Sequence, residues 1–193
     1  MKSITVFCGA STGTNPQYIE QATAVGKALA EQDITLVYGG ADLGLMGAVS
    51  NGALNANGRV IGVLPDFLQN REIAHKSLTE LIIVDSMHTR KTKMNELSDG
   101  VIALPGGFGT IEELFEILTW VQLGLNNKPI GVLNIGGYFD PLITFIQTMV
   151  TSGFLRAIDA ELLIVRENID ELLIEMKNYS LPPIKNQMVD DLS

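Results

Sequence analysis

Short apolar runs that end in glycine-bearing turns and lead into helices constrain the fold of this chain more than any other feature. The clearest run is VIAL at residues 101–104, which has the length and composition of a buried strand. The turn PGGFGT at residues 105–110 follows, and apolar residues then recur at helical spacing. Two further runs end in the same way, at Gly9 and at Gly39-Gly40. The pattern predicts strand, glycine turn and helix, repeated along the chain.

The rest of the chain continues this alternation. Because strands that are nearly all apolar need cover on both faces, we expect an α/β protein with a Rossmann-like, doubly wound and mostly parallel sheet. Residues 1–180 should form a single nucleotide-binding domain, with a mobile tail at 181–193. Strands are expected at residues 2–8, 34–38, 59–64, 81–84, 101–104, 129–135 and 162–165. Helices are expected from Asn15-Pro16, from the loop that ends at Gly47 to about residue 57, at 87–97, from 111 to 122, from 140 to about 152 and at 169–177.

The three glycine turns should meet at one place. In a parallel sheet the loops that follow the strands gather at the carboxyl edge, where ligands bind in doubly wound folds. Glycine lets the backbone approach a ligand closely, and the first N–H groups of the following helix are unsatisfied. This geometry suits a phosphate. The segment 66–79 has no clear periodicity and is predicted to be a functional loop.

Composition excludes several classes of protein. The 193 residues carry 13 basic and 22 acidic side chains, a net charge of −9, which argues against general binding of nucleic acid or of an anionic membrane surface. The single cysteine, Cys8, forms no internal disulfide, which favours a reducing, cytoplasmic setting. Neither a secretory signal nor a run of about 20 apolar residues is present.

Familiar site motifs are mostly missing. The chain has no G-x-G-x-x-G, no Walker G-x-x-x-x-G-K-[ST] and no H-E-x-x-H. Two histidines and one cysteine do not favour a dedicated zinc site. GASTG at residues 9–13 matches the nucleophile elbow of hydrolases, but it follows the first strand, and neither His75 nor His88 lies near a late strand end. A small polar loop that touches a ligand is the better interpretation.

A basic pair, Arg90-Lys91, stands out against the acidic background. It lies shortly after Ser86, which follows the fourth predicted strand, so it begins a helix at the same edge as the glycine turns. A basic cluster is commonly a solvated helix face. Cations are, however, disfavoured near a helix N-terminus, and a bound anion would offset this cost.

The start of the helix after the glycine turn has two interpretations. Thr110 and Glu113 fit a capping box, with threonine at the N-cap and glutamate at the third helical position. A ligand could also take over the same backbone donors. The sequence leaves both open.

Two motifs together resemble the signature of the lonely-guy (LOG) family. MHTRK at residues 87–91 matches M-x-x-R-K, and PGGFGTIEE at residues 105–113 matches P-G-G-x-G-T-x-x-E. The similarity covers roughly residues 2–180 and includes the segments FCGAS, YGG, GLMG and WVQLG. Members of this family are cytokinin riboside 5′-monophosphate phosphoribohydrolases, and they are often mislabelled lysine decarboxylases.

The resemblance implies hydrolysis of the N-glycosidic bond of a purine nucleoside 5′-monophosphate, which yields free base and ribose 5-phosphate without a cofactor. It implies that Arg90 and Glu113 are catalytic, and that the turn at residues 107–110 holds the phosphate. Family members are typically homodimers, so a homodimer is expected here. The full set of expected substrate contacts is Ser11, Gly39, Gly40, Glu72, Lys91, Gly107, Phe108, Gly109, Thr110, Ile111, Glu112 and Thr119.

Two other functions remain open at this point. One is a broader purine nucleotide 5′-monophosphate nucleosidase that acts on AMP. The other is a non-enzymatic carrier, because molybdenum-cofactor carrier proteins share the Rossmann-like scaffold. Retention of both Arg90 and Glu113 favours an enzyme, since a carrier needs the glycine turn but not the acid–base pair. A lysine decarboxylase would need a Schiff-base lysine, for which Lys91 is the only candidate near the expected site.

Overall fold

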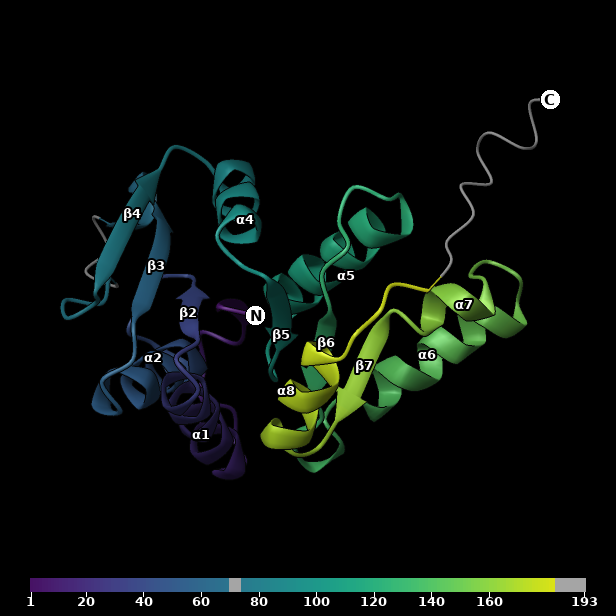
Figure 1. The fold of residues 1–193 in the computed structure, drawn as a ribbon, viewed down its shortest axis with the longest axis horizontal. Helices are drawn as coiled ribbons and strands as arrows, with labels where there is room; N and C mark the ends of the chain where they lie inside the picture. The colour runs from purple at the N-terminus through teal and green to yellow at the C-terminus, as the bar shows by residue number, and fades with distance from the viewer. Residues whose placement is uncertain (70–73, 183–193) are drawn as a thin grey trace.

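The computed structural model describes residues 1–69 and 74–182, and these residues form one parallel sheet between two layers of helices (Figure 1). Within them the sheet has seven strands in the order β4-β3-β2-β1-β5-β6-β7, and each pair of neighbours is parallel. The doubly wound α/β fold expected from the sequence is confirmed. The strands are β1 (Ser3–Phe7), β2 (Thr35–Tyr38), β3 (Val60–Pro65), β4 (Glu80–Val84), β5 (Gly100–Ala103), β6 (Ile130–Leu133) and β7 (Leu163–Arg166).

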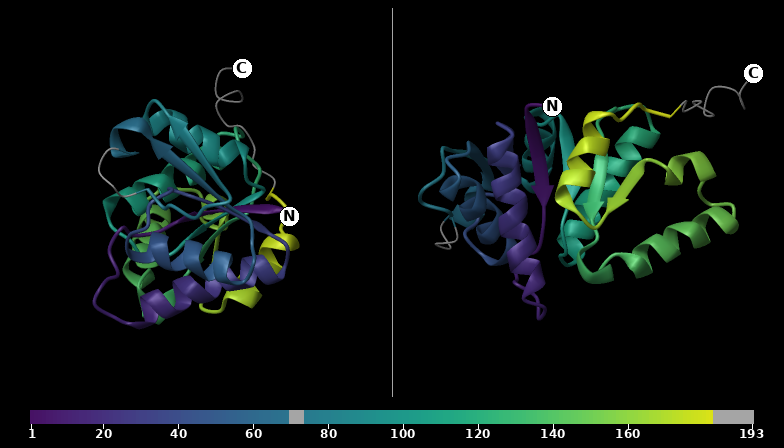
Figure 2. Two further views of the ribbon diagram at one scale, coloured as in Figure 1. Left: turned by 90° about the vertical axis from the view of Figure 1, so that its left-hand side faces the viewer. Right: turned by 60° about the horizontal axis from the view of Figure 1, so that its bottom comes forward.

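Helices cover both faces of the sheet, as the two further views make clear (Figure 2). One apolar core packs α1, α2 and α8 against one face, and a second core packs α4 and α5 against the other. The helices are α1 (Gln17–Glu31), α2 (Gly44–Asn55), α3 (Asp66–Gln69), α4 (Met87–Glu96), α5 (Phe108–Gln122), α6 (Asp140–Thr151), α7 (Ala157–Ala160) and α8 (Ile169–Lys177), with a short 3₁₀ turn η1 (Ile135–Gly137).

Each strand supplies both cores because successive side chains point to opposite faces. In β5, Val101 and Ala103 enter the core beside α5, whereas Ile102 enters the core beside α1 and α2. In β2, Leu36 and Tyr38 likewise face one core and Val37 the other. All of these side chains are fully buried. Burial on both faces explains why the strands read as continuous apolar runs.

The strand order reverses between β1 and β5, which makes this the switch point of the sheet. In doubly wound folds a crevice opens at such a point, beyond the carboxyl ends of the strands. Here the N–H of Gly9 donates to the carbonyl of Pro105 at 3.0 Å. A Cβ on Gly9 would lie 3.2 Å from Cα of Gly106, which is tighter than ordinary packing allows. Two of the three glycine turns therefore meet in close contact.

Several predicted boundaries were wrong. Helix α1 begins at Gln17 rather than at Asn15-Pro16, because the Asn15 carboxamide oxygen accepts the N–H of Gln17 from outside the helix. The sixth strand ends at Leu133, since Gly136 and Gly137 both have positive φ and turn the chain into η1. Helix α7 was not predicted at all.

The predicted loop at residues 66–79 is partly regular. It begins with the short helix α3, and Ala74 forms an antiparallel bridge with Ala41. Residues 70–73 and 183–193 lie outside the described part of the chain, so the predictions for Glu72 and for most of the tail fall there. None of the described helices is long and apolar enough to cross a membrane.

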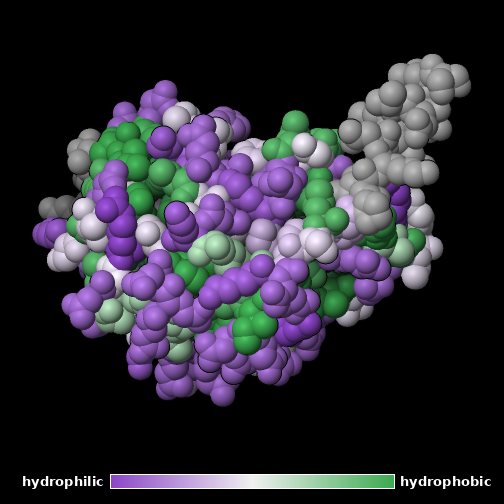
Figure 3. All heavy atoms as spheres, in the orientation of Figure 1, coloured by the Kyte–Doolittle hydropathy of each residue, from purple (hydrophilic) through white to green (hydrophobic). Residues whose placement is uncertain are grey.

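The surface is largely hydrophilic on the face shown in Figure 3, with apolar side chains gathered over the β3–β4 edge of the sheet. Ile83 of the edge strand β4 is 39% exposed there. The carboxyl ends of β1 and β5 lie inside the fold, between α2, α4 and α5. The candidate site is built at these two strand ends.

Candidate active site at the switch point

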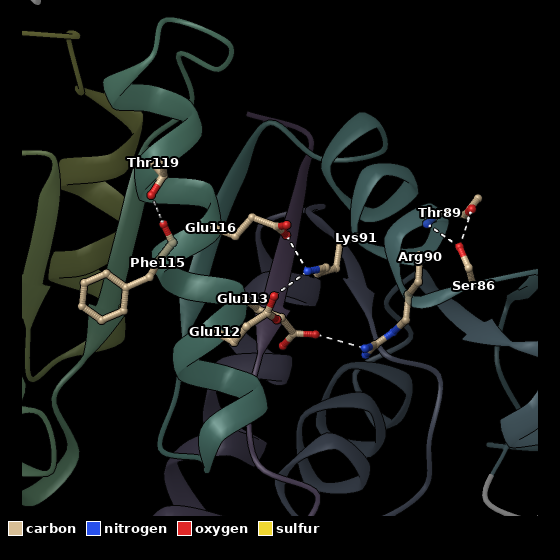
Figure 4. A network of polar contacts seen from close by, with 9 residues as sticks. All are labelled: Ser86, Thr89, Arg90, Lys91, Glu112, Glu113, Phe115, Glu116 and Thr119. Atoms are coloured by element: carbon tan, nitrogen blue, oxygen red, sulfur yellow. Dashed lines mark hydrogen bonds and ion pairs between the residues drawn. The ribbon is translucent and has the colours of Figure 1, made fainter.

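Helix α4 carries the basic pair, and its first turn is capped by a side chain. Ser86 has an extended backbone, and its hydroxyl accepts the N–H of Thr89 at 3.1 Å, as an N-cap does. This cap fixes the start of α4 immediately after β4. Arg90 and Lys91 therefore leave the helix near its first turn, on the side that faces α5 (Figure 4).

Helix α5 begins three residues earlier than the capping box predicts. Its N-cap is Gly107, no side chain caps it, and Phe108, Gly109 and Thr110 already belong to the helix. The N–H of Ile111 closes the first turn on the carbonyl of Gly107 at 3.2 Å. The capping-box interpretation of Thr110 and Glu113 is therefore wrong. The first N–H groups of α5 point toward the end of the sheet without a side-chain cap.

The carboxylate of Glu113 instead pairs with Arg90. Arg90 Nη1 lies 3.0 Å from Glu113 Oε1, and Arg90 Nε donates to the carbonyl of Val63 at 3.2 Å. The two side chains are only 11% and 9% exposed. A carboxylate of the protein itself thus offsets the cost of placing a cation near the start of α4, and the predicted bound anion stays a prediction.

Gly39 has a steric reason to be glycine. A Cβ at this position would lie 2.3 Å from Arg90 Nη2, so any other residue would displace the guanidinium. Gly39, which was predicted to contact the substrate, therefore leaves the space that the Arg90 guanidinium occupies. Its neighbour Gly40 has φ +79°, and its carbonyl accepts the N–H of His75. Gly40 turns the chain away from the sheet beside the guanidinium.

Burial sets the acidity of Glu113. Removal from water disfavours the ionised form and raises the pKa of this carboxyl above its ordinary value, although the charge of Arg90 pulls the pKa back down. Glu112 adds a smaller upward push and Lys91 a smaller downward one. A carboxyl with a raised pKa beside an arginine is typical of a group that exchanges a proton or meets a developing positive charge.

Glycines at the start of α5 leave open space. A Cβ on Gly107 or on Gly109 would meet no atom within 4 Å, and neither has a positive φ. The protein's own packing therefore does not require glycine at either position. Gly106 differs, because a Cβ there would lie 2.1 Å from Thr110 Oγ1. The space beyond Gly107 and Gly109 could hold a ligand against the helix N-terminus.

A pocket of about 290 Å³ lies over these groups. Its walls join the end of β1, the start of α2, the guanidinium and carboxylate pair, and the first turn of α5. The residues that line it are Cys8, Gly9, Ala10, Met46, Arg90, Gly107, Gly109, Thr110 and Glu113.

A second pocket of about 530 Å³ adjoins the first and shares Gly9, Ala10 and Gly107 with it. Ser11, predicted as a contact, lines this second pocket, and its hydroxyl oxygen accepts the N–H of Gly13. Tyr18 and Tyr138 meet edge to face at the wall, with ring centroids 5.7 Å apart.

Other predicted contacts lie away from these pockets. The side chain of Phe108 is 97% exposed, and Ile111 packs against the core beside α5. Glu112 holds the ammonium of Lys91 at 2.5 Å, and neither of these two lines either pocket. Thr119 points to the other side of α5, where its hydroxyl donates to the carbonyl of Phe115 (Figure 4). It lines a separate apolar groove.

Several residues of the pockets were missed by sequence reasoning. Cys8 and Met46 line the first pocket, and burial raises the pKa of the Cys8 thiol. The hydroxyl of Tyr138 donates to the carbonyl of Gly106 at 2.5 Å. A signal for Tyr138 was present, because it follows Gly136-Gly137 at the end of another strand. Within the described residues, no group of three or more His, Cys, Asp and Glu side chains could hold a metal ion.

Comparison with known proteins places the chain in context. A family model described as "Possible lysine decarboxylase" matches residues 46–176. The cytokinin riboside 5′-monophosphate phosphoribohydrolase of Rhodococcoides fascians is 46% identical over 178 residues, which cover 92% of this chain and 90% of that protein. The cytokinin riboside 5′-monophosphate phosphoribohydrolase LOG7 of Arabidopsis thaliana is 44% identical over 178 residues, which cover 92% of this chain and 82% of that protein.

Solved structures agree on the architecture. The molybdenum cofactor carrier protein of Chlamydomonas reinhardtii superposes with a TM-score of 0.71 at 24% identity, over 91% of this chain and 96% of that one. The molybdenum cofactor binding protein of Rippkaea orientalis gives 0.68 at 24% identity, over 92% and 96%. At this identity the likeness concerns the fold alone.

The fold and the pocket define a doubly wound α/β protein with an arginine–carboxylate pair at the switch point of its sheet. Its sequence relatives make the assignment specific. The chain belongs to the cytokinin riboside 5′-monophosphate phosphoribohydrolase, or LOG, family.

Proposed function

We propose that this protein hydrolyses the N-glycosidic bond of cytokinin riboside 5′-monophosphates and releases the free base and ribose 5-phosphate. The observation that carries the proposal is the buried pair of Arg90 and Glu113, which lines a pocket together with the uncapped N-terminus of α5. The names of relatives at 44% and 46% identity support the same reaction.

The proposed roles follow from the chemistry of the bond. An N-glycosidic bond breaks through a ribose with oxocarbenium character, so a carboxylate beside the sugar can stabilise positive charge or activate water. We assign this role to Glu113. The guanidinium of Arg90 holds the substrate or stabilises the departing base. The first N–H groups of α5 hold the 5′-phosphate, and glycine at positions 107 and 109 lets the phosphate approach them.

Lysine decarboxylation is poorly supported, despite the description of the matching family. That reaction needs a lysine amine that can form a Schiff base. Burial would lower the pKa of Lys91, but hydrogen bonds to Glu112 and Glu116 outweigh burial and raise it above the ordinary value. An ammonium held by two carboxylates is a poor nucleophile. Lys91 also lies outside both pockets described above.

The reaction can be tested directly on the purified protein. Incubation with N6-isopentenyladenosine 5′-monophosphate should release free base and ribose 5-phosphate, measured by liquid chromatography and a ribose 5-phosphate assay. The unphosphorylated nucleoside should remain nearly untouched, because it lacks the group that binds at α5. Glu96→Gln, a change of an exposed glutamate on α4, is the matched surface control.

The same assay separates the alternatives. Comparable kcat/KM for AMP and other purine monophosphates would identify a broader nucleosidase. Nucleotide binding without release of base from any purine monophosphate would identify a carrier and overturn the proposal.

We also propose that the protein acts in the cytoplasm as a homodimer. Large apolar side chains exposed on the surface, such as Phe145 at 56% and Phe154 at 87%, are consistent with an interface. Light scattering coupled to gel filtration should give twice the mass of the 20.9 kDa chain. A monomer mass at micromolar concentration would contradict this part of the proposal.

A further inference from the structure

Lys91 is the most completely enclosed cation in the site region, and it does not face the pocket. The residue is 6% exposed. Its ammonium lies 2.5 Å from Glu112 Oε1 and 3.0 Å from Glu116 Oε2, and both carboxylates come from α5 (Figure 4). An ammonium this well buried needs opposite charge beside it. The two glutamates supply that charge.

The geometry of α5 separates this cluster from the catalytic pair. Glu112 and Glu116 are four residues apart and share one stripe of the helix, whereas Glu113 lies about 100° further round. Adjacent side chains on α4 therefore meet different stripes of α5. Arg90 reaches Glu113 at 3.0 Å, and Lys91 reaches the other two carboxylates.

Glu116 completes the cluster although it lies outside the P-G-G-x-G-T-x-x-E motif. Its Oε2 is buried, and the ammonium of Lys91 lies 3.0 Å from it. The ion pair with Lys91 offsets its charge. Glu112 is 56% exposed and could be screened by water, but Glu116 is only 25% exposed. Glu116 is thus the carboxylate that holds the Lys91 ammonium on the more buried side of this cluster.

The balance of charge around Glu113 depends on this cluster. Arg90 and Lys91 face it from α4, Glu112 flanks it on α5, and the thiol of Cys8 faces it from the end of β1. Without Lys91, the negative charges of Glu112 and Glu116 would no longer be offset. Like charges nearby favour the protonated form of a carboxyl.

We infer that Lys91 is a positioning residue, held by Glu116, which acts on Glu113 through the contact between α4 and α5 and not by touching the substrate. The inference rests on the proposed function, in which the ionised Glu113 carboxylate meets the ribose. It differs from the expectation from sequence, which made Lys91 a substrate contact.

The titration of Glu113 tests the inference without any assay of turnover. Glutamate labelled with ¹³C at Cδ is followed by NMR against pH, and Glu113→Gln identifies the signal of residue 113. Lys91→Met should raise the titration midpoint of Glu113 above the wild-type value. Lys91→Arg should keep it near the wild-type value. Glu116→Gln should lower it, because the charge of Lys91 is then less neutralised.

Kinetics add a second readout. If the wild type hydrolyses nucleotide, Lys91→Met should shift the acid limb of kcat/KM to higher pH by the same amount as the NMR midpoint and lower kcat/KM at pH values below that midpoint. KM for the nucleotide should change little at a pH where Glu113 is ionised.

Each result has one meaning. A Glu113 titration that moves in neither variant overturns the inference, and a raised KM with an unmoved acid limb makes Lys91 a substrate contact instead. Should Lys91→Met fail to fold, the downward shift in Glu116→Gln still decides. A wild type that releases no base refutes the proposed function, while the NMR midpoints still judge the role of Lys91.

Discussion

Two arginine–carboxylate pairs in this protein show how a structural pair and a proposed catalytic pair differ. Arg156 donates hydrogen bonds to Asp159 from Nε at 2.7 Å and from Nη2 at 2.6 Å. Gln122 also donates to this carboxylate. The Asp159 side chain is 0% exposed. Both carboxylate oxygens are thereby paired inside the protein, and Arg156, the N-cap of α7, lies only three residues before Asp159.

Arg90 and Glu113 are joined differently. A hydrogen bond of 3.0 Å connects them across two helices, and both line a pocket. Asp159 also lines a groove, but Arg156 and Gln122 hold both of its oxygens. A single hydrogen bond joins Glu113 to Arg90, so this second pair presents charge to a space that a ligand can enter. Partial pairing at a pocket is the feature that distinguishes a reactive group from a structural one.

The largest expected effect tests whether the two pairs differ in their contribution to turnover. Glu113→Gln should reduce kcat/KM for the nucleotide by about 10²–10⁴-fold and leave the fold intact, because the amide keeps the shape but loses the charge. Asp159→Asn should do the opposite, with a Tm lower by roughly 5 °C and near-normal turnover. Steady-state kinetics and thermal unfolding of both variants check this. Equal losses of turnover would mean that the two pairs do not differ in kind.

A smaller effect extends the comparison to the glycines of the turn. Gly107→Ala places its Cβ in open space, so the fold should persist while KM for the nucleotide rises about 10-fold through the lost approach to α5. Gly106→Ala places its Cβ 2.8 Å from the N atom of Gly9 as well as against Thr110, so it should lower Tm. Nucleotide titrations and melting curves separate them. An unchanged KM in Gly107→Ala would remove this glycine from the phosphate site.

The smallest effect concerns stability against pH. The pKa of Glu113 is raised above its ordinary value of 4.5 in the folded protein, chiefly by burial. The folded chain therefore keeps a proton that the unfolded chain has already lost. Relative to Glu113→Gln, the free energy of unfolding should fall as pH rises from 4.5 through the folded pKa, and then level off. Urea unfolding of both proteins across this range measures the difference. A difference that grew with pH would show that the fold favours the ionised form.

Sequence predicted the scaffold of the site well because each element is locally encoded. Apolar runs, glycine turns and helical periodicity define β1, β5 and α5, and parallel topology then brings their ends together. Placement of Arg90 near the glycine turns followed from the same rule. The position of Arg90 near a helix start indicated that an anion should lie beside it, but the prediction was a bound anion, whereas the structure pairs Arg90 with Glu113.

Side-chain partners across helices were not predictable in the same way. The Thr110–Glu113 pattern fits a capping box locally, but the extended backbone of Gly107 starts α5 earlier and frees Glu113 to reach α4. The distance between α4 and α5 decides which carboxylate meets which cation. Thr119 illustrates the other limit, because two helical turns beyond the motif it faces a different groove.

The close approach of Gly9 and Gly106 has a consequence for folding kinetics. Thr5 of β1 pairs with Val101 of β5, so the walls of the pocket come from strands that are far apart in the chain and pair only after a large loop has closed. The parallel pair β1 and β2, joined through α1, can form early, but the pocket cannot form before β1 pairs with β5. Recovery of nucleotide hydrolysis during refolding should accordingly report completion of the whole sheet and lag behind the return of helical signal.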